Sequence, residues 1–278
     1  MAEKLCFKTA DELSKLISSR QVSPVEVVQE HISRIQFLEP KLNSYITILA
    51  DSALKQAKEH ESEIIGGVYR GPLHGVPVAL KDIFYVTGVP NTYGSKINKD
   101  FIPRFNSTVV NKFADAGAVL MGKLNLHQFA FGPTGENHHY GDMHNPWDVD
   151  SYTGGSSGGS GSAVAAGQTT IAMGSDTGGS IRIPSALCGI VGLKPTFGRV
   201  SKYGVNPLAW SLDHVGPMVR TVKDAALVLN SIAGYDQRDL CSVNLPVPDF
   251  TAGLSGDTLP FGRISRPFLN DFWRFKKT

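Results

Sequence analysis

Two glycine- and serine-rich runs contain the residues best suited to chemistry. Ser156 lies in the run GGSSGGS at positions 154–160, and Ser180 closes the run GSDTGGS at positions 174–180. Glycine lets backbone N–H groups approach a bound group closely, and successive exposed N–H groups form a site for negative charge. A serine hydroxyl beside such a site is the arrangement that acyl transfer requires. A glycine-rich turn capped by serine is the structural alternative.

A lysine supplies the base that such a serine needs. Lys81 follows the apolar stretch 76–80, which predicts an internal strand. Because burial disfavours the ammonium form, a buried lysine becomes an uncharged amine that can accept a proton. A lysine that reaches solvent from the strand end is the alternative. His74, His127 and His214 are single histidines that lie outside both runs. The combination favours Lys81 as the base, with Ser156 passing the proton from Ser180.

The sequence resembles the amidase signature family of serine hydrolases. The segments that carry the resemblance are GGSSGGS, GSDTGGSIRIPSALCGIVGLKPT, GPLHGVPVALKD and GPTGEN, and the likeness extends from about residue 8 to residue 250. The resemblance implies that Ser180 is the nucleophile, Ser156 the bridging serine and Lys81 the base. It also implies a cis peptide bond between Gly155 and Ser156.

The resemblance assigns supporting roles around the nucleophile. It implies that the backbone of Thr177, Gly178 and Gly179, with that of the nucleophile, forms an oxyanion hole. Asp176 and Arg182 flank this loop with opposite charges. We expect them to form a structural pair that holds the loop.

The implied function is hydrolysis of a linear carboxamide through a serine acyl-enzyme, with release of ammonia or an amine. The substrate would be a small amide, and neither a metal nor an organic cofactor takes part. A first alternative is the glutaminase (A) subunit of a tRNA-dependent amidotransferase, whose partners would be the other subunits. Segments 205–208 and 138–140 favour the stand-alone amidase. A second alternative is a truncated, non-catalytic fragment.

Other motifs are weaker. The run at 154–158 also fits the G-x-S-x-G elbow of α/β-hydrolases, with Asp213 and His214 as partners of Ser156. That elbow requires an apolar strand before it, whereas residues 145–150 are polar and typical of a turn. The spacing of His138, His139, Asp142 and His144 fits no metal-ligand motif.

The elements that must position these residues follow from periodicity and turn signals. Capping boxes at 9–12 and 23–26 predict two helices, a third is predicted at 50–62, and the opening is expected to be all-helical. After Gly71, short apolar runs alternate with helical segments. We expect strands at 76–80, 118–121 and 170–174. Helices are expected from Ser107 to 117, over 160–167, after Ser180 and over 221–233. The predicted fold is therefore α/β, a mixed sheet flanked by helices.

Three parts are expected along the chain. Residues 1–70 form a helical segment that packs on the core, and residues 71–255 form the amidase-signature core. Residues 256–278 are basic and aromatic without periodicity. Because members of the resembled family are longer, we expect the chain to be truncated at its C-terminus and its fold to be incomplete there.

Composition restricts the remaining possibilities. With 278 residues, 41% of them hydrophobic, the chain can bury a large core. A net charge of +2 gives no reason to expect nucleic acid or an acidic membrane as a partner. No apolar run is long enough to span a bilayer, and three scattered cysteines indicate no disulfide framework. We expect a cytoplasmic protein that could form homo-oligomers.

Overall fold

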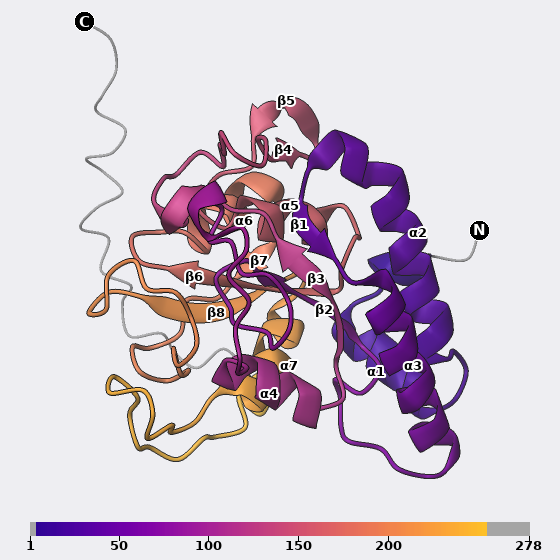
Figure 1. Ribbon diagram of the computed structural model, residues 1–278. Helices are drawn as coiled ribbons and strands as arrows, with labels where there is room; N and C mark the ends of the chain where they lie inside the picture. Colours follow the sequence, from indigo (N-terminus) through magenta and orange to yellow (C-terminus); the bar gives the residue numbers. More distant parts are fainter. Residues whose placement is uncertain (1–3, 255–278) are drawn as a thin grey trace, which may run out of the picture.

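The computed structural model describes residues 4–254 and has a six-stranded central sheet (Figure 1). The spatial order is β1-β3-β2-β6-β8-β7. The inner strands β3, β2 and β6 are parallel, and β1, β8 and β7 pair antiparallel to their neighbours. The strands of this sheet are β1 (Tyr45–Ile48), β2 (Pro77–Lys81), β3 (Val119–Leu124), β6 (Ile171–Asp176), β7 (Val191–Gly192) and β8 (His214–Val219). The predicted α/β class with a mixed sheet is confirmed.

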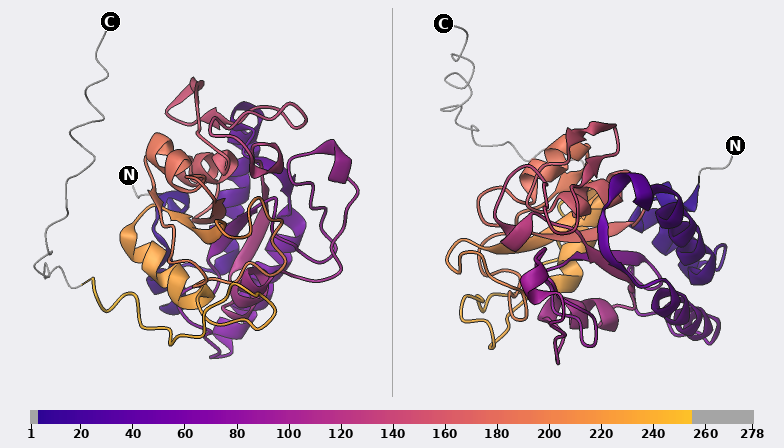
Figure 2. Two further views of the ribbon diagram at one scale, coloured as in Figure 1. Left: turned by 90° about the vertical axis from the view of Figure 1, so that its left-hand side faces the viewer. Right: turned by 45° about the horizontal axis from the view of Figure 1, so that its top comes forward.

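Helices cover both faces of this sheet. Its α-helices are α1 (Ala10–Ser18), α2 (Pro24–Leu42), α3 (Ala50–Ile65), α4 (Thr108–Asp115), α5 (Gly158–Ala165), α6 (Arg182–Cys188) and α7 (Val222–Ile232). Short 3-10 turns lie at Leu5–Phe7, Lys96–Asn98 and Gln128–Ala130. A separate hairpin pairs β4 (His144–Asn145) with β5 (Asp148–Tyr152). Figure 2 shows α1–α3, in indigo and purple, gathered at one end of the molecule.

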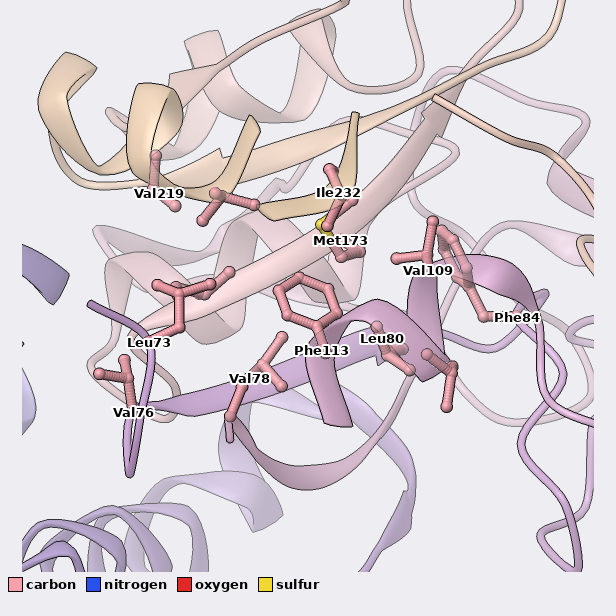
Figure 3. Packing of buried hydrophobic residues seen from close by; sticks show 14 of the residues in the cluster. Leu73, Val76, Val78, Leu80, Phe84, Val109, Phe113, Met173, Val219 and Ile232 are labelled. Carbon is pink, nitrogen blue, oxygen red and sulfur yellow. The ribbon is translucent and has the colours of Figure 1, made fainter. Parts of the chain in front are cut away.

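Alternating side chains divide the core into two clusters. Val78 and Leu80 of β2 pack with residues of α1, α4 and α7, whereas Ala79 packs with α2, α3 and α5. Figure 3 shows the first cluster, with Phe113 of α4 close to Val78 and Leu80 of β2. Because β2 is covered on both faces, every one of its residues is buried, which explains its continuous apolar sequence.

Two predicted helix starts are confirmed in detail. The side chains of Thr9 and Ser23 each accept a hydrogen bond from the backbone N–H of the third helical residue, a glutamate. The carboxylate of that glutamate accepts one from the backbone N–H of the capping residue. The prediction for Ser107 is only half right. Helix α4 begins directly after it, but the Ser107 side chain makes no capping hydrogen bond.

The expectation of an all-helical opening is wrong. Residues Tyr45–Ile48 form β1, which pairs with β3 at the edge of the sheet. Four residues are too few for a clear period-two pattern, so the pairing depends on contacts distant in sequence. The boundary at residue 70 stays a prediction. The segment 256–278 lies outside the described residues. Among residues 4–254, no helix combines the length and apolar character needed to cross a bilayer.

Candidate active site

The predicted site residues lie at the carboxyl ends of parallel strands. Lys81 is the last residue of β2, and Asp176 is the last residue of β6. The loop from β6 to α6 carries Ser180. Because parallel strands end at the same edge of a sheet, the two loops that follow β2 and β6 meet there.

Lys81 contacts two serine hydroxyls. Its Nζ lies 2.6 Å from Ser156 Oγ and 2.9 Å from Ser175 Oγ, and the lysine side chain is fully buried. The contact expected between Lys81 and Ser156 is therefore present. Burial lowers the pKa of Lys81 to about 7, although the negative charges of Asp213 and Asp176 act to raise it. The amine is thus substantially uncharged at neutral pH.

A second buried lysine shows what is unusual about Lys81. Lys123 on the adjacent strand β3 is equally buried, but its Nζ contacts Asp82 Oδ1 at 2.6 Å and Asn91 Oδ1 at 3.0 Å. Within residues 4–254, no carboxylate lies within ion-pair distance of Lys81. Lys123 has the partner of a cation, whereas Lys81 has the partners of a neutral base.

Backbone hydrogen bonds fix the position of Ser156. The peptide bond between Gly155 and Ser156 is cis. The Gly155 N–H donates to Pro133 O at 2.7 Å, and Ser156 O accepts from His127 N–H at 3.0 Å. A Cβ at position 155 would lie 2.6 Å from Gly132 O, so only glycine fits.

The loop that carries Ser180 is organised around one buried carboxylate. Asp176 accepts hydrogen bonds from the backbone N–H groups of Gly179 at 2.9 Å and Ile181 at 3.2 Å. The Arg182 guanidinium donates two more, at 3.0 and 2.9 Å. Burial alone would raise the pKa of Asp176, but these hydrogen bonds hold it below its usual value. Asp176 and Arg182 therefore form the expected pair.

The same contacts identify which backbone groups are available to an oxyanion. The Gly179 N–H is already donated to Asp176. The N–H groups of Thr177, Gly178 and Ser180 have no acceptor in the described part of the chain. They are the groups free to bind negative charge. The resemblance assigns the Gly179 N–H to this site as well, but it binds the Asp176 carboxylate instead.

Ser180 is partly exposed and adjoins the Ser156 segment. The Ser157 N–H donates to Ser180 O at 3.3 Å, which joins the two glycine-rich runs. Among residues 4–254, no hydrogen bond connects the hydroxyls of Ser156 and Ser180. The structure therefore brings Lys81 and Ser156 into contact and places Ser180 beside them.

Known proteins share most of this sequence. The sequence profile of the family described as Amidase matches residues 26–261. This chain belongs to the amidase family. It is 48% identical over 253 residues to the A-subunit of the glutamyl-tRNA(Gln) amidotransferase of Trichodesmium erythraeum, a match that covers 91% of this chain and 52% of that protein. The chain thus spans about half the length of the curated relatives it matches.

Solved amidase structures share the fold. Native peptide amidase from Stenotrophomonas maltophilia superposes with a TM-score of 0.85 at 38% identity, covering 89% of this chain and 53% of that one. The glutamyl-tRNA(Gln) amidotransferase A-subunit from Thermotoga maritima gives a TM-score of 0.77 at 36% identity, covering 89% and 51%.

Ser175 is a second hydroxyl contact of Lys81 that the sequence does not predict. It belongs to the run 174–180 and contacts Lys81, yet its type and spacing predict no role for it. Its position on β6 next to β2 provides the signal, because parallel neighbours place their ends side by side.

The rival elbow has no support in the geometry. The Asp213 carboxylate accepts hydrogen bonds from Leu208 N–H and from the Thr177 hydroxyl. The Nδ1 atom of His214 lies 2.6 Å from Leu212 O. Neither residue is oriented as a partner of Ser156, so the rejection of that alternative holds.

One group of potential metal ligands occurs among residues 4–254, and none of the predicted site residues belongs to it. It consists of His60, Glu63 and His74. His74 Nδ1 accepts a hydrogen bond from Arg70 N–H at 3.1 Å, which puts the ring proton on Nε2, facing Glu63 at 3.0 Å. The Arg70 guanidinium also donates to both oxygens of Glu63. Glu63 is thus paired with Arg70, and this ion pair links α3 to the segment before β2.

Proposed function

We propose that this amidase cleaves a carboxamide through a Ser180 acyl-enzyme, with Lys81 as the base. The observation that carries the proposal is the buried Lys81 amine, which has no counter-ion among residues 4–254 and lies 2.6 Å from Ser156 Oγ. A base with a pKa of about 7 combines a large neutral fraction with useful basicity at neutral pH.

The first step forms the acyl-enzyme. The Ser180 hydroxyl turns toward Ser156 and attacks the carbonyl carbon, so that a C–O bond forms. Its proton passes to Ser156, whose own proton moves to the Lys81 amine. The negative charge on the carbonyl oxygen is bound by the N–H groups of Thr177, Gly178 and Ser180. Loss of one such donor costs about 100- to 1000-fold in rate in other hydrolases.

The second half returns the enzyme to its starting state. The C–N bond breaks, and the leaving nitrogen takes a proton from the Lys81 ammonium through Ser156. Water then attacks the ester at Ser180, giving its proton to the same relay. The acid is released and the hydroxyl is restored. All these proton transfers are assigned to side chains of this protein.

For the substrate, we propose the side-chain amide of glutamine, in a glutaminase subunit that works with amidotransferase partners. The support is the 48% identity to an amidotransferase A-subunit over 91% of this chain. This reverses the order of preference that the sequence alone suggests, which places a stand-alone amidase first.

A stand-alone amidase remains the second candidate. The observation that favours it is the higher TM-score with peptide amidase, 0.85 against 0.77 for the amidotransferase protein. The small-amide substrate would then be hydrolysed without partner subunits.

Ammonia release distinguishes the two candidates. We expect the purified chain to release ammonia from L-glutamine faster than from a C-terminal peptide amide. Ser180→Ala should lower the rate by at least about 10⁴-fold, and Lys81→Met by nearly as much, because the relay acts as a unit. Preference for the peptide amide would favour the second candidate. Turnover that survives in Ser180→Ala would contradict both.

The third possibility, a non-catalytic fragment, makes its own prediction. A folded wild-type chain would then release ammonia from neither amide and would not react with a serine-directed fluorophosphonate. Reaction with the probe without amide turnover would indicate an assembled site that lacks its substrate-binding elements.

A further inference from the structure

Asp213 lies directly opposite the nucleophile loop. Strands β6 and β8 pair antiparallel, with Asp176 opposite His214. The next residues outward in that register are Thr177, the first residue of the loop, and Asp213, which precedes β8. The Thr177 hydroxyl donates a hydrogen bond to Asp213 Oδ1.

The same carboxylate closes the loop that precedes β8. Its oxygens accept hydrogen bonds from the backbone N–H of Leu208 at 2.9 Å and from that of Ala209 at 3.0 and 3.1 Å. Asp213 is only 8% exposed. Each hydrogen bond to a buried carboxylate is therefore worth more than one to a neutral acceptor.

Asp213 also lines a cavity that includes a hydroxyl partner of the base. The lining residues of this cavity include Ser175, the second hydroxyl partner of Lys81, and Leu208. Leu208 and Asp213 thus line the same cavity as Ser175, and Asp213 connects this segment to Thr177, the first residue of the oxyanion site.

We propose that Asp213 is a positioning residue that holds the nucleophile loop in place through the Thr177 hydroxyl. The Thr177 N–H is one of the three unengaged donors identified among the described residues, so a shift of this residue moves an oxyanion donor directly. Displacements of about 1 Å at such positions cost about 100-fold in rate. The inference rests on the proposed function, because it assigns the loop a role in that reaction.

The Asp213 charge has a second consequence. Asp213 and Asp176 are the carboxylates whose charges raise the pKa of Lys81 against burial. The other charged or titratable groups near Lys81 are His127, whose pKa is lowered mainly by burial, and Asp82, which is paired with Lys123. Removing the charge of Asp213 therefore lowers the pKa of Lys81, whereas removing the Thr177 hydroxyl leaves that charge in place.

The rate of Ser180 modification by a fluorophosphonate, measured from pH 5 to pH 9, tests both consequences. In that reaction an O–P bond forms, the P–F bond breaks, fluoride leaves and the serine proton passes to Lys81. Thr177→Val should lower the limiting rate about 10- to 100-fold without moving the acid limb of the profile. Thr177→Ser, which keeps the hydroxyl, should recover most of the rate that is lost in Thr177→Val. Asp213→Asn should lower the rate similarly and move the acid limb to lower pH.

Asp236→Asn is the matched control. Asp236 is similarly buried and accepts a hydrogen bond from Ser201 Oγ at 2.7 Å, but it has no contact with the nucleophile loop. Asp236→Asn should change neither the limiting rate of labelling nor the pH of the acid limb. Circular dichroism identifies variants that do not fold, and Thr177→Val keeps the test decisive if Asp213→Asn is one of them.

The outcomes separate this inference from the function on which it rests. An unlabelled wild-type chain contradicts both. A labelled wild type with unchanged rates in Thr177→Val or in folded Asp213→Asn overturns the positioning role alone. An acid limb that does not move in Asp213→Asn also overturns the inference.

Discussion

At the scale of single residues, Lys81 and Lys123 show how the groups that contact a buried lysine determine its protonation state. Both side chains are fully buried on adjacent strands. Lys123 is paired with Asp82 at 2.6 Å, whereas the hydrogen bonds of the Lys81 amine within the described part of the chain go to serine hydroxyls. A buried ammonium without a counter-ion loses its hydration and gains little in return, so deprotonation relieves the cost. The residue type alone does not distinguish a base from a structural cation.

The pH dependence of turnover follows from this environment. Lys81 must be neutral to accept a proton, and its pKa in the folded protein is about 7. We expect kcat/KM for amide hydrolysis to rise with pH through about pH 7 and then to level off. Initial rates between pH 5 and pH 9 in a constant-ionic-strength buffer measure this. A profile that is flat below pH 7 would contradict Lys81 as the base.

The two lysines should also respond oppositely to replacement by methionine. The pKa of Lys81 falls from 10.5 to about 7 on folding. Burial of the protonated amine therefore lowers the free energy of unfolding by its full amount below pH 7, and this loss of stability disappears above about pH 10.5. Lys81→Met should therefore raise the free energy of unfolding at pH 6. Lys123→Met should lower it by about 3–5 kcal/mol, because Asp82 is left buried without its cation.

Urea denaturation at pH 6 compares these variants. Lys81→Met should have a higher midpoint of denaturation than the wild type, although we expect it to be inactive. Lys123→Met should have a lower midpoint. A Lys81→Met variant destabilised as much as Lys123→Met would show that Lys81 stabilises the fold as a paired cation.

Sequence predicts some site residues and not others for a physical reason. Lys81, Ser156 and Ser180 lie in local patterns, an apolar strand end and two glycine-rich runs. Asp213 and Ser175 acquire their roles through strand pairing with distant residues. Only the register of β6 with β2 and β8 brings them to the site, and no local pattern specifies that register.

At the scale of elements, side-chain capping decides where a helix start can be predicted. Ser23 and Glu26 form a complete capping box at α2, with hydrogen bonds of 3.1 and 2.8 Å. The start of α4 lacks such a bond, although Ser107 stands at the same position.

Alanine substitutions test that difference. Ser23→Ala should lower the free energy of unfolding by about 0.5–2 kcal/mol, because a backbone N–H loses its acceptor. Ser107→Ala should change it by less than about 0.5 kcal/mol, because no capping bond is lost. Thermal denaturation followed by circular dichroism compares the two. Equal losses would mean that capping hydrogen bonds do not set the stability of these helix starts.

Elements are predictable where their pattern is continuous. The buried stretch that becomes β2 is uninterrupted, and its predicted bounds lie within one residue of the observed ones. Strand β8 is not predicted, because Gly216 and Pro217 interrupt it. Both residues disfavour a strand by propensity, yet pairing with β6 and β7 forms one. Tertiary pairing overrides the local preference here.

At the scale of the whole molecule, the sheet explains how distant segments form one site. Helices on both faces bury the strands, and the parallel ends of β2 and β6 bring Lys81 and the Ser180 loop together (Figure 1). The segment that holds Ser156 contacts both, through the Lys81 amine and the Ser180 carbonyl. The chain belongs to the amidase family and spans about half the length of the curated relatives it matches.

The residue that carries the covalent adduct tests the central claim most directly. The folded chain is treated with a fluorophosphonate and digested, and its peptides are sequenced by mass spectrometry. We expect the adduct on Ser180 alone, no adduct in Ser180→Ala, and labelling in Lys81→Met slowed at least about 100-fold. An adduct on Ser156, or labelling of Lys81→Met at the wild-type rate, would contradict the assignment of Ser180 as nucleophile and Lys81 as base.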